Sequence, residues 1–180
     1  MNNELKEKMA TSIATFILPR YKDITNVGLY LEQTVKFING YLLPLGEGDI
    51  TASMVSNYVK LKLIANPDHK QYNVDHIASL MFIAITKTVV SLDDIRFLLS
   101  IQKEHYTPQH AYDYFCEVFE SVLFNSFGIN KENAKPIKNN SNKNELMLST
   151  INAIVQKIYL DQYLLAYRNI EVNNQEIKLV

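Results

Sequence analysis

The amino-acid sequence predicts an all-α protein, and three observations support this fold class. Apolar residues recur at helical spacing along most of the 180-residue chain. Glycine and proline number only five each, which favours long helices over a turn-rich β protein. No segment shows a convincing alternation of apolar and polar residues, so we expect at most a tiny β-hairpin at residues 65–72.

Helical spacing and capping residues divide the chain into seven predicted helices. We expect them at residues 3–17, 29–43, 52–61, 74–89, 92–100, 108–127 and 145–168. Pro19 ends the first helix, and Pro108 occupies the first position of the sixth, where proline is tolerated. The predicted N-caps of the third, fourth and fifth helices are Thr51, Asn73 and Ser91. Roughly the last ten residues show no clear pattern.

The first and last predicted helices each carry an apolar stripe for packing. The stripe of the first helix consists of Leu5, Met9, Ile13, Phe16 and Ile17. The stripe of the seventh helix consists of Met147, Ile151, Ile154, Ile158 and Leu165. Between the sixth and seventh helices, the sequence NKENAKPIKNNSNKNE (residues 130–145) has almost no apolar residue. This segment is therefore predicted to be a mobile loop.

The composition limits the class of protein. The chain is 47% hydrophobic and 21% charged, with a formal net charge of -1, so it lacks the basic character of a tight nonspecific nucleic-acid binder. No run approaches the roughly 18 consecutive apolar residues of a membrane span, and the N-terminal segment is too interrupted for a signal peptide. With Cys116 as its single cysteine, the chain has no internal disulfide, which favours a cytoplasmic protein without membrane association.

No arrangement of residues in the sequence points to catalysis, a metal or a cofactor. The chain contains no GxxxxGK[ST], GxGxxG or HExxH motif. Asp93 and Asp94 fit the first turn of a helix, where acids favour the helix dipole. Cys116 lies among aromatic residues and fits a small core position. His105 and His110 are interpreted as solvated side chains, so we expect a non-enzyme with no catalytic or metal site and no cofactor.

The most informative stretch is ITASMVSNYVKLKLIANPDHKQY, residues 50–72, because its helix carries many small polar residues. Helical spacing predicts that its apolar side chains face inward: Val55, Tyr58, Val59 and Leu63. The opposite face then carries Ser53, Ser56, Asn57 and Lys60. A helix made only for packing would more often carry Leu, Ala, Glu and Lys there, so this outer face is suited to lie close against a partner.

Residues 51–72 also carry a local positive charge. They contain three lysines, Lys60, Lys62 and Lys70, and one acid, Asp68, which gives a local charge of +2. Arg20 and Lys22 could extend this positive patch if the N-terminal segment folds nearby. Serine and asparagine can contact phosphates or base edges, and asparagine pairs well with adenine. Taken alone, the same pattern also fits a plain polar face of a helical bundle.

The order of the motifs resembles a known family. Residues 50–99 resemble the winged helix-turn-helix domain of the mercury-resistance-regulator (MerR) family. In this resemblance, ITASMVSNYVKLKLI corresponds to the recognition helix, Lys70-Gln71-Tyr72 to the wing, and NVDHIASL and SLDDIRFLL to the two helices that follow. Residues 19–99 are still more similar to an uncharacterised family of predicted transcriptional regulators of low-GC Gram-positive bacteria, through LPRYKDI, LYLEQTVKFIN, MVSNYVK and YNVDHIA.

The resemblance implies a DNA-binding transcriptional regulator with a winged helix-turn-helix. The residues that it places at double-stranded DNA are Thr51, Ser53, Ser56, Asn57, Lys60, Lys62, Lys70 and Tyr72. Two serines stand where the MerR recognition helix usually has arginines, and Lys62 stands where it usually has glycine. If residue 62 adopts a left-handed conformation, a side chain there costs on the order of 1 kcal/mol.

The second half of the chain suggests either a dimer interface or an effector pocket. The predicted sixth helix is apolar nearly all round, apart from Asp113, Glu117 and Glu120, so we expect a second subunit to cover part of it in a homodimer. Tyrosines could instead line a pocket for a small-molecule effector, although such side chains are more often core or interface residues. These are Tyr106, Tyr112, Tyr114, Tyr159, Tyr163 and Tyr167.

The sequence therefore predicts three regions and two alternative functions. The regions are an N-terminal helix (residues 1–18), a MerR-like DNA-binding domain (19–104) and a C-terminal helical dimerisation or effector region (105–180). The first function is a dimeric, cytoplasmic transcriptional regulator. The alternative is a non-catalytic helical protein-interaction module with weak or no DNA binding, which the near-neutral charge and the missing arginines favour.

Overall fold

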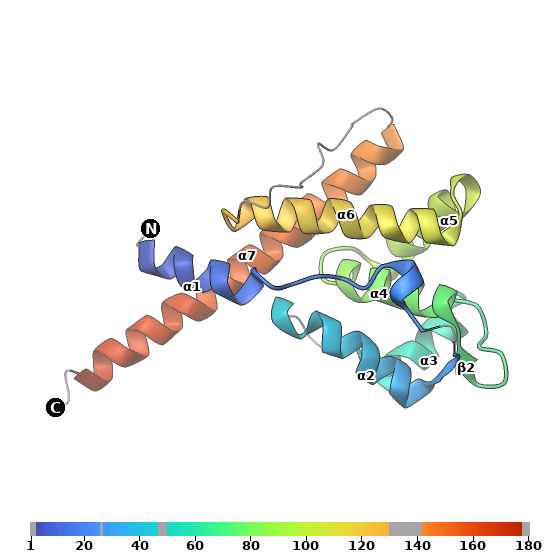
Figure 1. Ribbon diagram of the computed structural model, residues 1–180, viewed down its shortest axis with the longest axis horizontal. Helices are drawn as coiled ribbons and strands as arrows, with labels where there is room; N and C mark the ends of the chain where they lie inside the picture. The colour runs from blue at the N-terminus through green and yellow to red at the C-terminus, as the bar shows by residue number, and fades with distance from the viewer. Residues whose placement is uncertain (1–2, 26, 47–49, 130–141, 178–180) are drawn as a thin grey trace.

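The computed structural model describes residues 3–25, 27–46, 50–129 and 142–177, and these are mostly α-helical, which confirms the predicted fold class (Figure 1). The α-helices are α1 (Asn3–Ile13), α2 (Leu31–Leu42), α3 (Ala52–Lys60), α4 (Val74–Thr86), α5 (Leu92–His105), α6 (Pro108–Ser126) and α7 (Asn142–Ile177). Two short 3-10 helices, η1 (Tyr21–Asp23) and η2 (Leu43–Leu45), lie in the connections before and after α2. None of the helices in the described ranges has the length and apolarity needed to cross a bilayer.

Several predicted helix ends are wrong. The fourth helix ends at Thr86 and not at residue 89, and the fifth continues past residue 100 to His105. The first helix ends at Ile13, where the Phe16 N–H donates to the Ile13 carbonyl at 2.9 Å, and so the helical spacing no longer holds beyond it. Phe16 and Leu18 are therefore buried, whereas Ile17, which was placed on the apolar stripe, is 56% exposed. The last helix continues to Ile177, through residues for which the sequence shows no clear pattern.

The connection before α7 is only partly described. Of the segment predicted to be a mobile loop, residues 130–141 lie outside the described residues, and the rest begins α7. Leu165, placed on the packing stripe of this helix, is exposed, because the C-terminal part of α7 extends past α1 and away from the body of the molecule (Figure 1). Met147, Ile151, Ile154 and Ile158 are buried as predicted.

The small β-structure differs from a local hairpin. Strand β2 (Gln71–Tyr72) pairs antiparallel with β1 (Leu29–Tyr30), directly before α2, with Leu29 opposite Tyr72. Within residues 65–72, the expected hairpin is reduced to one bridge between Asp68 and Gln71. Gly28 allows the two segments to approach, because a Cβ at this position would lie 2.7 Å from the Gln71 Cβ. The pairing fixes the segment after α3 against the start of α2.

One hydrophobic cluster extends from α1 to α7, and α4 lies at its centre. Every residue of α4 from His76 to Thr86 is buried except Ser79. Helix α6 packs against α4, α5, α7 and η1 of the same chain, and most of its apolar side chains are buried. The expectation that α6 needs a second subunit to cover it is therefore wrong, because its own chain covers it.

A buried ion pair connects the N-terminal segment to α6. The Arg20 guanidinium donates to both carboxylate oxygens of Glu120, at 2.8 and 2.6 Å, and the Leu18 N–H donates to the same carboxylate at 2.8 Å. The hydrogen bond to Glu120 is the main reason why the pKa of Arg20 is raised. Arg20 therefore does not extend the positive patch near α3, contrary to the expectation from the sequence.

Replacing Glu120 should destabilise the protein far more than replacing a carboxylate in an exposed ion pair. Glu120→Ala leaves a partly buried guanidinium and a buried N–H without their acceptor, so we expect a loss of about 3 kcal/mol in the free energy of unfolding. The matched control is Asp93→Ala, which breaks the exposed pair of Asp93 with Arg96 and should cost less than about 1 kcal/mol. Urea unfolding followed by circular dichroism measures both. Equal losses would contradict the structural role of Glu120.

Candidate nucleic-acid interface

Helix α3 begins at a position fixed by two polar side chains. Thr51 is its N-cap, and the Thr51 hydroxyl oxygen accepts from the Met54 N–H at 3.2 Å. Just before it, the side chain of Asn39 on α2 makes two hydrogen bonds to the backbone of Ile50, at 2.9 and 3.0 Å. Asn39 could not be predicted as a functional residue from the sequence, because its two hydrogen bonds join residues on different elements. They hold the start of α3 against α2.

The two faces of α3 are arranged as the sequence predicts. Val55 and Tyr58 are buried, and Leu63, just after the helix, is buried with them. On the opposite face Ser53, Asn57 and Lys60 are exposed, and Ser56 is half-buried. Thr51 is exposed as well. The exposed face therefore consists of short polar side chains, which end at a lysine.

The C-terminus of α3 is closed by a Schellman motif. The Leu63 N–H donates to the Tyr58 carbonyl at 2.9 Å, and the Lys62 N–H donates to the Val59 carbonyl at 3.0 Å. This motif places Lys62 in the left-handed region, with φ 55°. Arg96 of α5 donates to the remaining Leu61 carbonyl at 3.1 Å.

The following segment contains a second left-handed site. His69 and Lys70 have φ values of 45° and 66°, and the Gln71 N–H donates to the Asp68 carbonyl at 2.7 Å across this tight turn. Asn and Gly are the residues that such a turn favours. Lys62, His69 and Lys70 are the non-glycine residues with positive φ that the described part of the chain contains, and all three are basic and exposed.

Tyr72 does not belong to this exposed surface. Its side chain is only 5% exposed, and its ring packs edge-on against His76 with ring centroids 5.7 Å apart. Burial raises the pKa of its hydroxyl. The prediction that Tyr72 contacts DNA is therefore wrong, because its side chain is buried against His76 of α4. The exposed tyrosine of the small sheet is its neighbour Tyr30.

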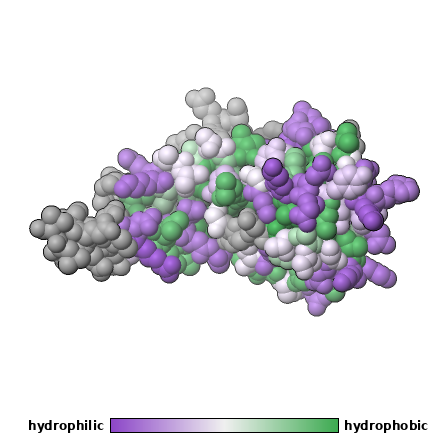
Figure 2. All heavy atoms as spheres, turned by 90° about the horizontal axis from the view of Figure 1, so that it is seen from below, coloured by the Kyte–Doolittle hydropathy of each residue, from purple (hydrophilic) through white to green (hydrophobic). Residues whose placement is uncertain are grey.

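The exposed cations of this surface are lysines. Arg20 and Arg96 both donate to carboxylates, of Glu120 and Asp93, so neither is a free charge beside α3. Lys60, Lys62 and Lys70 are exposed, and hydrophilic side chains gather at the end of the molecule where residues 66–70 lie (right in Figures 1 and 2). We call the surface formed by Thr51, Ser53, Ser56, Asn57, Lys60, Lys62 and Lys70 the α3 face.

The residues considered for catalysis or metal binding remain separate. Cys116 is fully buried, and burial raises the pKa of its thiol to about 12, so it remains protonated at neutral pH. His105 and His110 are exposed. In the ranges that the structure describes, no three His, Cys, Asp or Glu residues are grouped so that they could hold a metal ion.

Comparison with known proteins identifies a family. The family model described as "Domain of unknown function (DUF1836)" matches residues 19–115, more than half of the chain, and the chain belongs to this family. The matched segment runs from the N-terminal connection through the α3 face to the first part of α6. No curated protein and no solved structure matches the chain.

Replacing Lys62 by glycine should stabilise the protein. Glycine adopts the left-handed conformation without the steric cost of a side chain, so Lys62→Gly should raise the free energy of unfolding by about 1 kcal/mol. Lys62→Ala removes the same charge but keeps a Cβ, and it should leave the stability nearly unchanged. Urea unfolding midpoints of the three proteins provide the test. If Lys62→Ala stabilises as much as Lys62→Gly, the charge and not the backbone conformation determines the difference.

Proposed function

We propose that this protein is a DNA-binding transcriptional regulator that reads double-stranded DNA through a MerR-like winged helix-turn-helix. In this proposal α2 and α3 form the helix-turn-helix, and residues 61–72 form the wing. The observation that carries the proposal is the occurrence of Lys62, His69 and Lys70 at left-handed backbone positions. Glycine or asparagine would be less strained there, so the side chains themselves have a use, and exposed cations beside a polar helix suit a phosphate backbone.

The dimensions of α3 support insertion into a major groove. A helix of nine residues is about 13 Å long, and its exposed face carries only short side chains apart from Lys60. The groove is about 12 Å wide and admits one helix. Ser53 and Asn57 would approach base edges. The three lysines of the α3 face and the Thr51 hydroxyl would contact phosphates.

We further propose that the regulator is a cytoplasmic homodimer that associates through the projecting part of α7. Leu160, Tyr163, Leu164 and Tyr167 recur at i, i+3, i+4 and i+7, and all except the half-buried Tyr163 are exposed. Tyr163 packs against the core, but Leu160, Leu164 and Tyr167 remain exposed, so the chain leaves most of this apolar stripe uncovered. Two copies packed along α7 would bury it and would present two α3 faces to two half-sites.

The alternative function is a helical protein-interaction module with weak or no DNA binding. Exposed apolar side chains near the two ends of α2 favour it: Val27 and Leu43 are each 74% exposed, and Tyr30 is 55% exposed. The net charge of -1 also gives little general attraction to DNA. DNA binding by the purified protein therefore separates the two functions.

Two substitutions on the α3 face should have different effects on DNA binding. Lys70→Ala should weaken binding to all sequences alike and should reduce the slope of log affinity against log salt by about one unit. Asn57→Ala should cost about 1–3 kcal/mol on the cognate fragment and little on random DNA. The cognate fragment comes from genome-wide mapping of the tagged protein, and fluorescence anisotropy at several salt concentrations gives the affinities.

The control for these two variants is Lys6→Ala, which removes an exposed lysine from α1, outside the α3 face, and should not change DNA affinity. Circular dichroism should show all variants folded, because Lys70 and Asn57 are exposed. If no genomic fragment binds more tightly than random DNA, the regulator proposal fails and the alternative function gains support.

The α7 stripe should control the oligomeric state. Leu160→Glu combined with Leu164→Glu places two charges in the proposed interface, so a dimer should become a monomer at about ten micromolar protein, with at least a tenfold rise in the dissociation constant. Light scattering and sedimentation measure the mass. Leu43→Glu, which changes an equally apolar exposed residue away from α7, is the matched control and should remain dimeric. A wild-type monomer across the micromolar range would rule out the dimer.

A further inference from the structure

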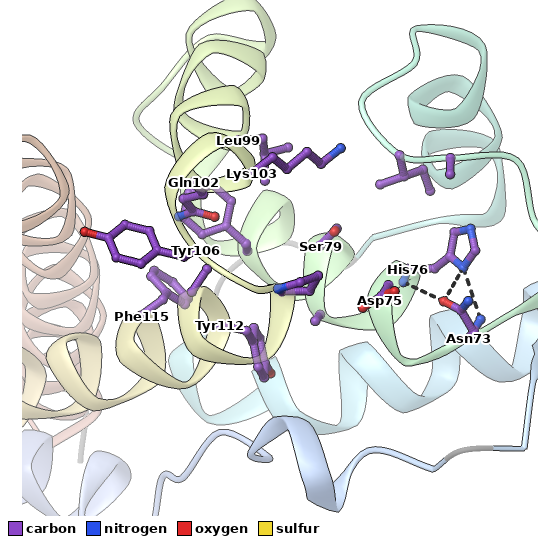
Figure 3. Close-up of a pocket in the computed structure, with 16 residues that line it drawn as sticks. Asn73, Asp75, His76, Ser79, Leu99, Gln102, Lys103, Tyr106, Tyr112 and Phe115 are labelled. Carbon is purple, nitrogen blue, oxygen red and sulfur yellow. Dashed lines mark hydrogen bonds between the residues drawn. The ribbon is translucent and has the colours of Figure 1, made fainter. Parts of the chain in front are cut away.

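A cavity lies between α4, α5, α6 and the segment that follows α3. Its volume is about 350 Å³, within the range of small-molecule sites. Leu99, Gln102, Lys103 and Tyr106 come from α5 and its end, and Ser79, His76 and Asp75 come from α4 (Figure 3). Of the six tyrosines considered for an effector pocket, Tyr106 and Tyr112 line this cavity.

The wall of this cavity combines apolar surface with unpaired polar groups. Phe82, Phe115 and Leu99 supply buried apolar surface. Among the described residues, the buried side-chain nitrogen and oxygen atoms without a hydrogen-bond partner are His76 Nε2, Gln102 Nε2 and the Tyr112 hydroxyl, and all three side chains line the cavity. Native proteins seldom leave such atoms unpaired, so three such groups around one cavity suggest a ligand that pairs with some of them.

Both nitrogens can donate a hydrogen bond. In the capping box of α4, His76 Nδ1 lies 3.1 Å from the Asn73 N and 2.6 Å from the Asn73 Oδ1 (Figure 3). In the tautomer in which Nδ1 accepts from the Asn73 N–H, the ring hydrogen is on Nε2 and can be donated to a ligand. The ring is only 6% exposed. Gln102 presents its amide nitrogen, which is also a donor. The Tyr112 hydroxyl lies beside the Cys116 thiol, so the two nitrogens are the groups left for a ligand to pair with.

We propose that this cavity binds a small aromatic molecule that carries a carboxylate or carboxamide. The aromatic body would pack against Phe82, Phe115 and Leu99, and its oxygen atoms would accept from His76 and Gln102. Lys103, at the exposed edge of the cavity, favours a carboxylate there. The acidic residue of the lining, Asp75, accepts a hydrogen bond from the Tyr21 hydroxyl. The site lies within residues 64–115 and needs no residue from a second subunit.

Occupancy of the cavity would act on the proposed wing, a step that rests on the proposed DNA-binding function. Ile64 and Ala65 precede the tight turn of residues 68–71, and Asn73 and His76 follow it, so both ends of the wing segment contribute to the wall. A ligand that moves these residues changes the position of Lys70 relative to α3. We expect the ligand to change DNA affinity by at least fivefold.

The test uses benzoate, 1-naphthoate and 1-naphthamide as probes on the full chain without DNA. Isothermal titration calorimetry and amide chemical shifts should detect submillimolar binding of at least one probe, with shifted resonances near His76 and Gln102. Ala111→Leu, which fills space in the cavity wall, should weaken binding at least tenfold, whereas Ala153→Leu, at an exposed site on α7, should not. No binding of any probe at 2 mM, or binding that Ala111→Leu leaves unchanged, overturns the proposal.

A second variant keeps the proposal testable if Ala111→Leu does not fold. Gln102→Leu removes one donor at similar size, so it should weaken 1-naphthoate at least fivefold and leave naphthalene, which has no acceptor, unchanged. Equal effects on both probes would contradict the role of Gln102.

Anisotropy on the cognate DNA, with and without 1-naphthoate, tests the coupling to the wing. If the probes bind but no DNA does, the ligand site stands and the proposed DNA-binding function fails; unchanged DNA affinity overturns only the coupling.

Discussion

The Glu120 carboxylate fixes how the N-terminal segment crosses the rest of the protein. Leu18 and Arg20 lie in an irregular connection, where backbone N–H groups have no helical partner, and Glu120 accepts from both residues. Seven residues earlier on α6, Asp113 accepts from the Tyr21 N–H at 2.8 Å. Helix α6 also packs against α4 and α7. This one helix therefore fixes both the connection that leads to β1 and α2 and the C-terminal helix. A buried carboxylate is costly without such partners, so the ion pair and the path of the chain depend on each other.

This use of arginine explains the character of the α3 face. Arg20 is engaged by Glu120, and Arg96 is engaged by Asp93 and by the Leu61 carbonyl that ends α3. Both arginines therefore stabilise the fold, and lysines supply the exposed charge. Two of those lysines, Lys62 and Lys70, have left-handed backbone conformations. Strain at these positions is maintained only because the surrounding structure determines the conformation: the Schellman motif at Lys62, and the turn closed by Gln71 at Lys70.

The features that the sequence predicts well are local. Thr51, Asn73 and Ser91 each cap a helix with the side chain, as expected, because a cap depends only on the next three residues. The polar and apolar faces of α3 follow from helical spacing in the same way. The missed features join distant residues: Glu120 is 100 residues from Arg20, and β2 pairs with a strand more than 40 residues earlier. The expected exposure of Tyr72 was wrong for the same reason, since this tertiary pairing and α4 bury it.

Helix α5 shows why the cavity and the α3 face should be considered together. At one point of α5, Arg96 donates to the Leu61 carbonyl, which adjoins the left-handed Lys62. Less than two turns further along, Leu99 and Gln102 line the cavity. On the other side of the cavity, α4 is almost wholly buried and its first turn is fixed by the Asn73–His76 capping box, so it has little freedom to move. A ligand that displaces α5 relative to α4 would therefore act directly on the end of α3, without a change elsewhere in the core. The hydrogen bond from Arg96 to the Leu61 carbonyl thus connects the cavity to the segment between α3 and α4 within one chain, whatever the oligomeric state.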